Sequence, residues 1–230
     1  MRFLIFSLIL FPGVLTKLEA ADSLKTVARP ELKLQRSAEY DYDLPEPGTY
    51  LLPVIKTAGN GVVLGPNSKR LSLHELFRGR IVLLSFIYTR CTDPRACLRA
   101  SGVLNELQRV SLKDPGIGTN LLLVTLSFDP SNDTPEVMGR YGRVYQLAEG
   151  GCEWLFLTPG SMAELQSLLE SYGQRVDRRK QFSPLGPYNH TLRVYLIDRP
   201  CRIRNIYSYG FLDPRLVVTD VRTLMIEERK

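Results

Sequence analysis

Two cysteines six positions apart are the residues of this chain best suited to do chemistry. Cys91 and Cys97 lie in the stretch SFIYTRCTDPRACLRAS, residues 85–101. Cys91 follows an apolar run, and Cys97 lies where a helical pattern begins. Two thiols at such a junction can exchange disulfides or hold a soft metal ion.

The start of the predicted helix favours ionised thiols. Asp93 is suited to cap the helix and Pro94 to occupy its first position. Cys97 then falls in or near the first turn, where the helix dipole stabilises a thiolate. Positive potential also comes from three arginines, Arg90, Arg95 and Arg99. We therefore expect both thiols to ionise more readily than free cysteine, and this polar setting argues against two inert buried cysteines.

The spacing of the cysteines leaves both chemistries open. A pair with two intervening residues forms a small ring on a helix terminus, which suits disulfide exchange. Here five residues intervene and form a looser loop. Such a loop still closes a disulfide, and it also places two sulfurs around a metal ion if a third ligand arrives from elsewhere.

The third ligand has to come from one of only two histidines. His74 lies in a short predicted helix far from the cysteines, and we interpret it as structural. His190 lies at the start of the strand predicted at 191–198, which we expect to neighbour the strand at 81–87 and to run antiparallel to it. The start of one strand then meets the end of the other, beside the cysteines. The predicted ligands are thus Cys91, Cys97 and His190, a soft set that suits Cu(I) or Cu(II).

Alternating strand and helix patterns position these residues. Apolar runs at 81–87, 121–128 and 153–158 are typical of buried parallel strands joined by right-handed crossovers. Hairpins are predicted from 49–55 with 61–64 and from 191–198 with 203–209. Helices are predicted at 71–79, 94–112, 133–148, 161–173 and 213–228. This order predicts an α/β, thioredoxin-like fold with a mixed central sheet, an N-terminal hairpin extension and flanking helices.

The N-terminus has the composition of an export signal. An apolar stretch follows Arg2 but is shorter than the roughly 20 residues that span a bilayer. Residues 1–20 are therefore predicted to be a signal peptide, with an uncleaved anchor as the alternative. Residues 21–48 are polar and aperiodic and predict an extended arm, and residues 49–230 form the predicted domain. We expect an exported protein, periplasmic or anchored facing the periplasm, with membrane association only if the N-terminal segment is retained.

Charge and composition give no support for nucleic-acid binding. The chain has 230 residues, of which 44% are hydrophobic, and a net charge of +6. Its basic stretches, such as 174–180 and 199–204, lack an accompanying aromatic or phosphate-cradling motif. They are interpreted as a solvated basic surface.

Four stretches resemble the Sco/SenC family of thioredoxin-fold copper chaperones, which are linked to assembly of cytochrome c oxidase. The resemblance extends from about residue 50 to residue 226. The stretches are SFIYTRC, SFDPSNDTPEVMGRY (127–141), WLFLTPGSMAELQSLLESYG (154–173) and YNHTLRVYLID (188–198). The middle two report mainly on the fold, whereas the cysteines and the histidine report on function.

The resemblance implies copper as cofactor, with Cys91, Cys97 and His190 as its ligands. It implies a respiratory oxidase subunit or another copper-accepting protein as partner, together with a thiol–disulfide reductant. Asp129 and Asp133 match the acidic segment of the family and are interpreted as a loop-shaping residue and a helix cap. One departure is the CTDPRAC run, because the family usually has three residues between its cysteines and a proline after the second.

Two other functions remain open from the residues. One is a thiol–disulfide oxidoreductase, in which Cys91 is the nucleophile and Cys97 resolves the mixed disulfide. The other is a peroxidase with Cys91 attacking peroxide, although no distinctive peroxidase motif surrounds it. Cys152 and Cys201 are predicted to lie on different sides of the sheet, unpaired and structural.

Overall fold

Three parallel strands form the centre of an eight-stranded sheet in the computed structural model, which describes residues 34, 39–147 and 150–228. They are β4 (Ile81–Ile87), β5 (Leu121–Ser127) and β6 (Glu153–Pro159), and β5 lies between the other two. Every residue of β4 and β5 is buried, because both faces of this part of the sheet are covered. The three predicted central strands are confirmed.

Antiparallel strands extend the sheet on both sides, in the order β1-β10-β9-β4-β5-β6-β2-β3. On the β4 side lie β9 (Val194–Ile197), β10 (Arg202–Tyr207) and β1 (Lys56–Thr57). On the β6 side lie β2 (Val62–Leu64) and β3 (Arg70–Ser72). The mixed central sheet and the β9–β10 hairpin agree with the prediction.

The predicted hairpin between residues 49–55 and 61–64 is wrong in its pairing. The backbone N–H of Ile55 donates to the carbonyl of Ile203, and the N–H of Ala58 donates to that of Cys201. These bonds fasten the first segment to β10, on the far side of the sheet from β2. The hairpin at this end of the chain is instead formed by β2 and β3.

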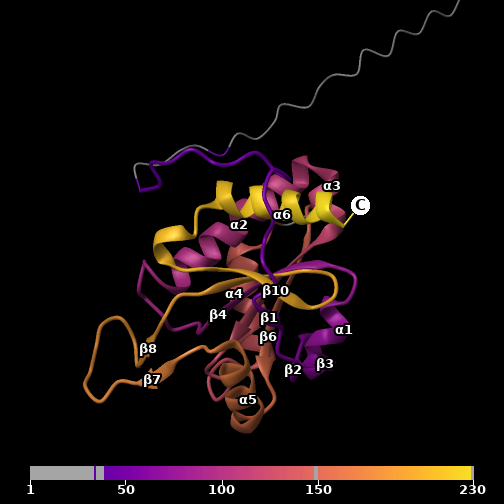
Figure 1. The fold of residues 1–230 in the computed structure, drawn as a ribbon. Helices are drawn as coiled ribbons and strands as arrows, with labels where there is room; N and C mark the ends of the chain where they lie inside the picture. The colour runs from indigo at the N-terminus through magenta and orange to yellow at the C-terminus, as the bar shows by residue number, and fades with distance from the viewer. Residues whose placement is uncertain (1–33, 35–38, 148–149, 229–230) are drawn as a thin grey trace, which may run out of the picture. The chain divides into compact units, whose positions relative to one another are not determined.

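Helices cover both faces of the sheet. Figure 1 shows α2, α3 and α6 on one side and α5 on the other. The α-helices are α1 (Leu73–Phe77), α2 (Cys97–Lys113), α3 (Pro115–Asn120), α4 (Pro135–Tyr145), α5 (Met162–Tyr172) and α6 (Pro214–Glu227). Two short 3-10 helices are η1 (Pro66–Ser68) and η2 (Tyr209–Phe211). The thioredoxin-like fold class is thereby confirmed.

Helices α4, α5 and α6 each begin at a residue whose side chain caps the helix. The side chain of Ser161 accepts a hydrogen bond from the N–H of Glu164 at the start of α5, and Asp213 caps α6. Asp133 does not cap α4, because Thr134 occupies that position and accepts from the N–H of Val137. The Asp133 carboxylate points instead toward the loop that follows β4.

The predicted start of α2 is also wrong. Helix α2 begins at Cys97, and Ala96 is the residue that precedes it. The Asp93 carboxylate accepts from the N–H of Arg95, and its carbonyl accepts from the N–H of Ala96. Asp93 therefore closes a separate turn, and Pro94 lies in that turn rather than in the helix.

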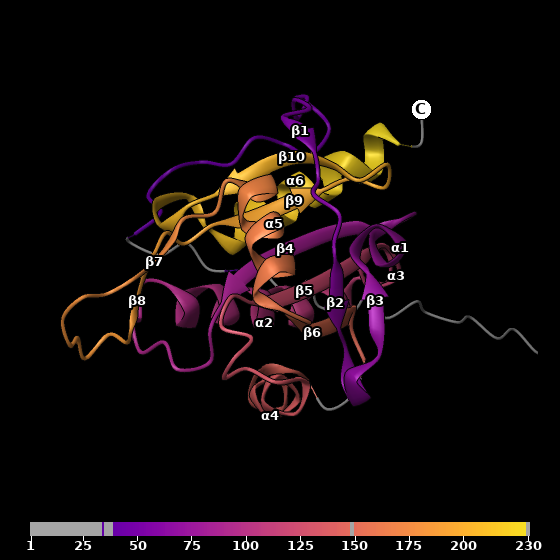
Figure 2. The same cartoon turned by 90° about the horizontal axis from the view of Figure 1, so that it is seen from below.

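A two-stranded hairpin projects from the body of the domain. It is formed by β7 (Val176–Arg178) and β8 (Tyr188–His190), which pair antiparallel in a sheet of their own. Figures 1 and 2 both show the connecting loop extending well away from the central sheet. The sequence patterns did not predict these strands.

The predicted signal peptide, and most of the predicted arm, lie outside the described residues. Within residues 39–147 and 150–228, no helix has the length and apolar character needed to cross a membrane. The end of the arm contacts the domain, since the ring of Tyr40 is buried and its hydroxyl accepts a hydrogen bond from Arg99 of α2. The Tyr40 carbonyl accepts another from Arg215 of α6.

Candidate metal centre

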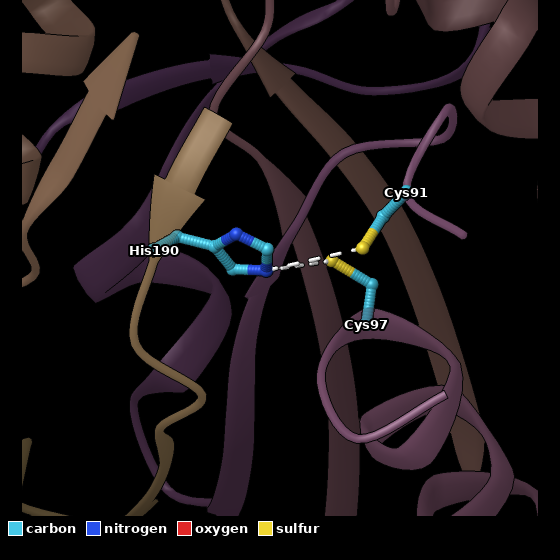
Figure 3. Close-up of side chains that lie close together, drawn as sticks. All are labelled: Cys91, Cys97 and His190. Atoms are coloured by element: carbon cyan, nitrogen blue, oxygen red, sulfur yellow. Dashed lines mark hydrogen bonds between the residues drawn. The ribbon is translucent and has the colours of Figure 1, made fainter. Parts of the chain in front are cut away.

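Three side chains from separate parts of the chain converge at one point. Cys91 lies in the loop after β4, Cys97 is the first residue of α2, and His190 is the last residue of β8. The distance from His190 Nε2 to Sγ is 3.2 Å for Cys97 and 4.0 Å for Cys91. All three potential ligand atoms lie within 4.8 Å of one another. Figure 3 shows the imidazole pointing at both sulfurs.

The sheet topology explains most of this convergence. Strand β9 runs antiparallel to β4, so the chain enters β9 at the end where β4 finishes. The prediction of this meeting is correct, but His190 is not the first residue of that strand. It belongs to β8, and β9 begins only at Val194.

Both sulfurs are buried and the imidazole is half-buried. Cys91 is 5% exposed and Cys97 is 1% exposed. Solvent therefore reaches the group mainly past Cys91 and the histidine ring. A site of this kind is shielded from bulk water but lies close enough to the surface for a metal ion or a partner thiol to reach it.

The two thiols differ in acidity. A hydrogen bond from Cys97 and a second from His190 lower the pKa of Cys91 to about 4, although burial opposes this shift. Burial raises the pKa of Cys97, and the neighbouring Cys91 thiolate raises it further, because it accepts a hydrogen bond from the Cys97 thiol and its charge opposes a second negative charge. The prediction that both thiols ionise readily thus holds for Cys91 and is wrong for Cys97. In the metal-free pair, one negative charge is held on Cys91.

Aromatic rings pack around the histidine. The His190 ring lies 5.5 Å from that of Tyr88 and 5.1 Å from that of Phe128, measured between centroids. Tyr188 packs against both of these rings, at 5.1 and 5.8 Å. These contacts restrict the rotation of the imidazole and limit access of water. Sequence reasoning missed all three residues, although Tyr88 lies in the same stretch as Cys91.

Asp133 holds the loop that carries Cys91. This carboxylate is fully buried and accepts from the backbone N–H of Thr89 at 2.9 Å and from its hydroxyl at 2.5 Å. It also accepts from the hydroxyl of Ser127 at 2.6 Å. Asp133 therefore ties the end of β5 to the loop two residues before Cys91.

Asp129 links the same loop to the projecting hairpin. Its carboxylate pairs with Arg90 at 2.9 Å and accepts a hydrogen bond from the hydroxyl of Tyr188 at 3.1 Å. It also accepts from the side chain of Asn132. Asp129 thus shapes its own loop, as expected, and in addition joins the residues next to Cys91 to β8.

The loop between β7 and β8 lies directly beside the cysteine loop. Thr92 donates from its hydroxyl to the carbonyl of Pro184 at 2.6 Å, and Tyr88 donates to that of Leu185 at 3.1 Å. Gly186 has a φ of +102°, and a Cβ on it would lie 2.0 Å from the Tyr88 hydroxyl oxygen. Only glycine permits this close approach of the two loops.

The other histidine and cysteines lie elsewhere. His74 shares a hydrogen bond with the carbonyl of Ala58 at 2.8 Å, as a structural residue does. Cys152 and Cys201 are buried, unpaired and outside the group of three. Burial raises the pKa of Cys152 to about 11. Among the described residues, this group is the one set of three or more histidine, cysteine or acidic side chains placed to hold a metal ion.

The chemistry of the donors indicates which ion would fit. Two sulfurs and one imidazole nitrogen form a soft set that favours copper or zinc over magnesium or calcium. Three protein donors leave room for an exchangeable fourth ligand. The same two sulfurs lie within 4.8 Å of each other, so a disulfide, with its sulfurs about 2 Å apart, would require the two side chains to move together.

Comparisons with known proteins point to one family. The family model described as SCO1/SenC matches residues 67–226. The SCO1 protein homolog of Bacillus subtilis (strain 168) is 27% identical over 139 residues, which cover 56% of this chain and 68% of that protein.

Solved structures share the fold. Arabidopsis thaliana ScoI with copper bound has a TM-score of 0.63 and 19% identity, covering 74% of this chain and 99% of that chain. BsSco, described with a disulfide switch and as a member of the Sco family of cytochrome c oxidase assembly proteins, has a TM-score of 0.56 and 22% identity. The match covers 80% of this chain and 98% of the BsSco chain.

Proposed function

The chain belongs to the SCO1/SenC family, and from this premise we propose that it binds copper through Cys91, Cys97 and His190. The observation that carries the proposal is the convergence of two sulfurs and an imidazole within 4.8 Å. Thiolates favour Cu(I), and imidazole also accommodates Cu(II). The Cys91 thiolate supplies a charged donor at neutral pH, because its pKa is lowered to about 4.

We further propose that the bound copper is cargo rather than a catalytic centre. The protein delivers it to a respiratory copper enzyme such as cytochrome c oxidase, or to another copper-accepting protein. Support comes from the BsSco description, which places that relative among cytochrome c oxidase assembly proteins. A half-buried imidazole beside two buried sulfurs leaves an open side from which an acceptor can take the ion.

Copper titration of the reduced protein tests the ligand set. We expect one copper ion per chain, and we expect Cys97→Ser and His190→Ala each to weaken binding by at least about tenfold, because each removes one of three donors. Cys152→Ser is the matched control, since it removes a buried thiol outside the group and should leave affinity unchanged. Equal affinity in all four proteins would contradict the proposal.

Thiol–disulfide exchange is a second candidate function, favoured by the unequal acidity of the two thiols. The Cys91 thiolate would attack a partner disulfide, form a mixed disulfide and release one partner thiolate. Cys97 would then lose its proton and attack Cys91 Sγ, which closes the Cys91–Cys97 disulfide and releases the second partner thiol. A thiol–disulfide reductant would restore the pair.

An assay of disulfide reduction separates the two functions. It measures the rate at which the protein reduces a small disulfide substrate while a dithiol supplies the electrons. An oxidoreductase keeps its turnover in His190→Ala and loses it in Cys91→Ser. A copper chaperone shows stoichiometric copper uptake with negligible turnover. Fast turnover without copper uptake would establish exchange as the function.

Export to the periplasm is part of the proposal and rests on the N-terminal sequence pattern. The apolar stretch after Arg2, followed by a polar region, has the order of a secretory signal. Fractionation of cells that express the full chain, with mass determination of the mature N-terminus, tests it. A cytoplasmic protein with an intact N-terminus would contradict this part of the proposal.

A further inference from the structure

The projecting hairpin is basic. Residues 175–187 carry four basic side chains and one acidic side chain, for a net charge of +3. The basic residues are Arg175, Arg178, Arg179 and Lys180, and the acidic one is Asp177. Most of these side chains are exposed, and Arg179 is half-buried.

These cations lack the carboxylate partners that several other arginines of the domain have. Arg70, Arg80 and Arg140, for example, each pair with a glutamate within 2.8 Å. Within the described ranges, no ion pair joins the four basic residues of 175–187 to an acidic side chain. Their charge is therefore available to a partner.

The loop between β7 and β8 also carries an exposed aromatic ring and borders two hollows. Phe182 is 96% exposed, the highest value among the large hydrophobic residues of the described chain. A hollow of about 390 Å³ lies between Arg90, the residues of 178–183 and Gly186. A second hollow of about 870 Å³ is lined by residues 177–183 and Asn189. A hollow that is lined by basic residues and lies next to an exposed aromatic ring can receive an acidic protein segment that also carries an apolar side chain.

The same surface borders the proposed copper site. His190 ends β8, and the loop contacts Thr92 and Tyr88 through the carbonyls of Pro184 and Leu185. Arg90, which precedes Cys91, lines the smaller hollow. A protein that approaches the His190 side of the site therefore meets this basic hairpin.

We propose that the β7–β8 hairpin is a docking surface for an acidic face of the protein that receives the copper. The inference rests on the proposed function, because it assumes an acceptor that approaches the Cys91–Cys97–His190 group. Arg178 and Lys180 attract the acidic face, and Phe182 occupies an apolar recess on it. Charge complementarity steers the acceptor so that its copper ligands meet the exposed side of the imidazole.

Fluorescence anisotropy with two labelled peptides tests the docking surface in the metal-free, full-length chain. The peptides share one central copper-binding segment containing Met and Cys, and they differ only in flanking glutamates or glutamines. We expect the glutamate peptide to bind about tenfold more tightly at low salt, and this preference to shrink as salt rises.

Charge-reversal variants locate the effect. The double variant Arg178→Glu/Lys180→Glu should lose the preference, and Phe182→Ala should weaken binding several-fold without changing its salt dependence. The matched control Lys69→Glu/Lys113→Glu alters net charge equally at exposed positions away from the hairpin and should keep the preference. Arg179 is left intact because its Nε donates to the carbonyl of Tyr188.

Three results would overturn the docking proposal. They are equal binding of both peptides, equal loss in both double variants, and binding to vesicles of phosphatidylglycerol and phosphatidylcholine without binding to the glutamate peptide. Copper stoichiometry on the same samples separates the two proposals. A chain that binds copper but shows no peptide preference loses only the docking surface. A chain with the reverse behaviour loses the copper function, and its hairpin then binds acidic peptides without serving a copper acceptor.

Discussion

At the scale of single residues, the two cysteines differ in protonation, with Cys91 as the thiolate and Cys97 as the thiol. Cys97 is almost fully buried at the start of α2 and donates toward Cys91, which keeps the negative charge. A helix N-terminus alone would have favoured ionisation of Cys97. Burial of its sulfur outweighs that effect, because a charge in the interior costs more than one turn of helix dipole supplies.

An ultraviolet titration of thiolate absorbance checks this difference. Because the pKa of Cys91 is lowered to about 4, its absorbance should persist from pH 7 down to about pH 5 and disappear as the pH falls through 4. Cys97→Ser weakens the hydrogen bond that is the largest cause, so the transition should move to higher pH. Cys152→Ser should leave it unchanged. A wild-type transition near the ordinary cysteine value would show that no such thiolate exists.

At the scale of elements, two loops and one short strand hold the site in place. The loop after β4 is fastened by Asp133, and the loop before β8 is fitted to it at Gly186. Neither fastening involves a metal ligand directly. The site therefore depends on contacts between elements that are distant in sequence, and these contacts can be broken one at a time.

Asp133→Asn should loosen the cysteine loop. An amide in place of the carboxylate leaves at least one donor of Thr89 or Ser127 without a charged acceptor, which costs about 2–3 kcal/mol of unfolding free energy. Copper affinity should fall as well, because Cys91 is two residues beyond Thr89. Urea denaturation and copper titration measure the two effects.

Thr134→Ala is the control for this substitution. It removes the N-cap of α4, at a cost of about 1 kcal/mol, and it should leave copper affinity unchanged. A similar loss of copper affinity in both variants would mean that Asp133 acts only through general stability.

Gly186→Ala should push the two loops apart. The new Cβ would lie 2.0 Å from the Tyr88 hydroxyl oxygen, and the backbone at this position has a positive φ, so we expect a loss of about 1–3 kcal/mol. Tyr88→Phe removes the obstructing oxygen. In a double-mutant cycle, the combined loss should be smaller than the sum of the single losses. Simple additivity would show that the two loops are not in contact.

The elements that the sequence predicted well are those with a strong local pattern. Strands β4, β5 and β6 are continuous apolar runs, and α5 and α6 begin at recognisable caps. The predicted pairing of residues 49–55 with 61–64 was wrong because β1 has only two residues, too few to carry a pattern that identifies its partner. That partner is β10, which is distant in sequence. The proximity of His190 to the cysteines could be predicted from the expected strand order. Strand β8 and the close packing at Gly186 could not be predicted, because both depend on tertiary contacts.

At the scale of the whole domain, the end of the predicted arm is part of the fold. Tyr40 is 2% exposed, and its hydroxyl donates to the carbonyls of Tyr209 and Leu212. Arg99 of α2 lies over its ring, with the guanidinium carbon 5.3 Å from the centroid. The arm thus connects η2 and α6 with the helix that begins at Cys97.

Tyr40→Ala in the full chain tests whether this contact is needed for the stability of the domain. Removal of a buried aromatic ring should lower the unfolding free energy by about 3 kcal/mol, while unfolding remains a single transition. Tyr209→Ala is the control, because that side chain is 40% exposed and should cost much less. Because Arg99 follows Cys97 by two residues on α2, the loss at Tyr40 should also weaken copper binding slightly. If Tyr40→Ala left both stability and copper binding unchanged, the arm would be a passive tether rather than a support for the helix that carries Cys97.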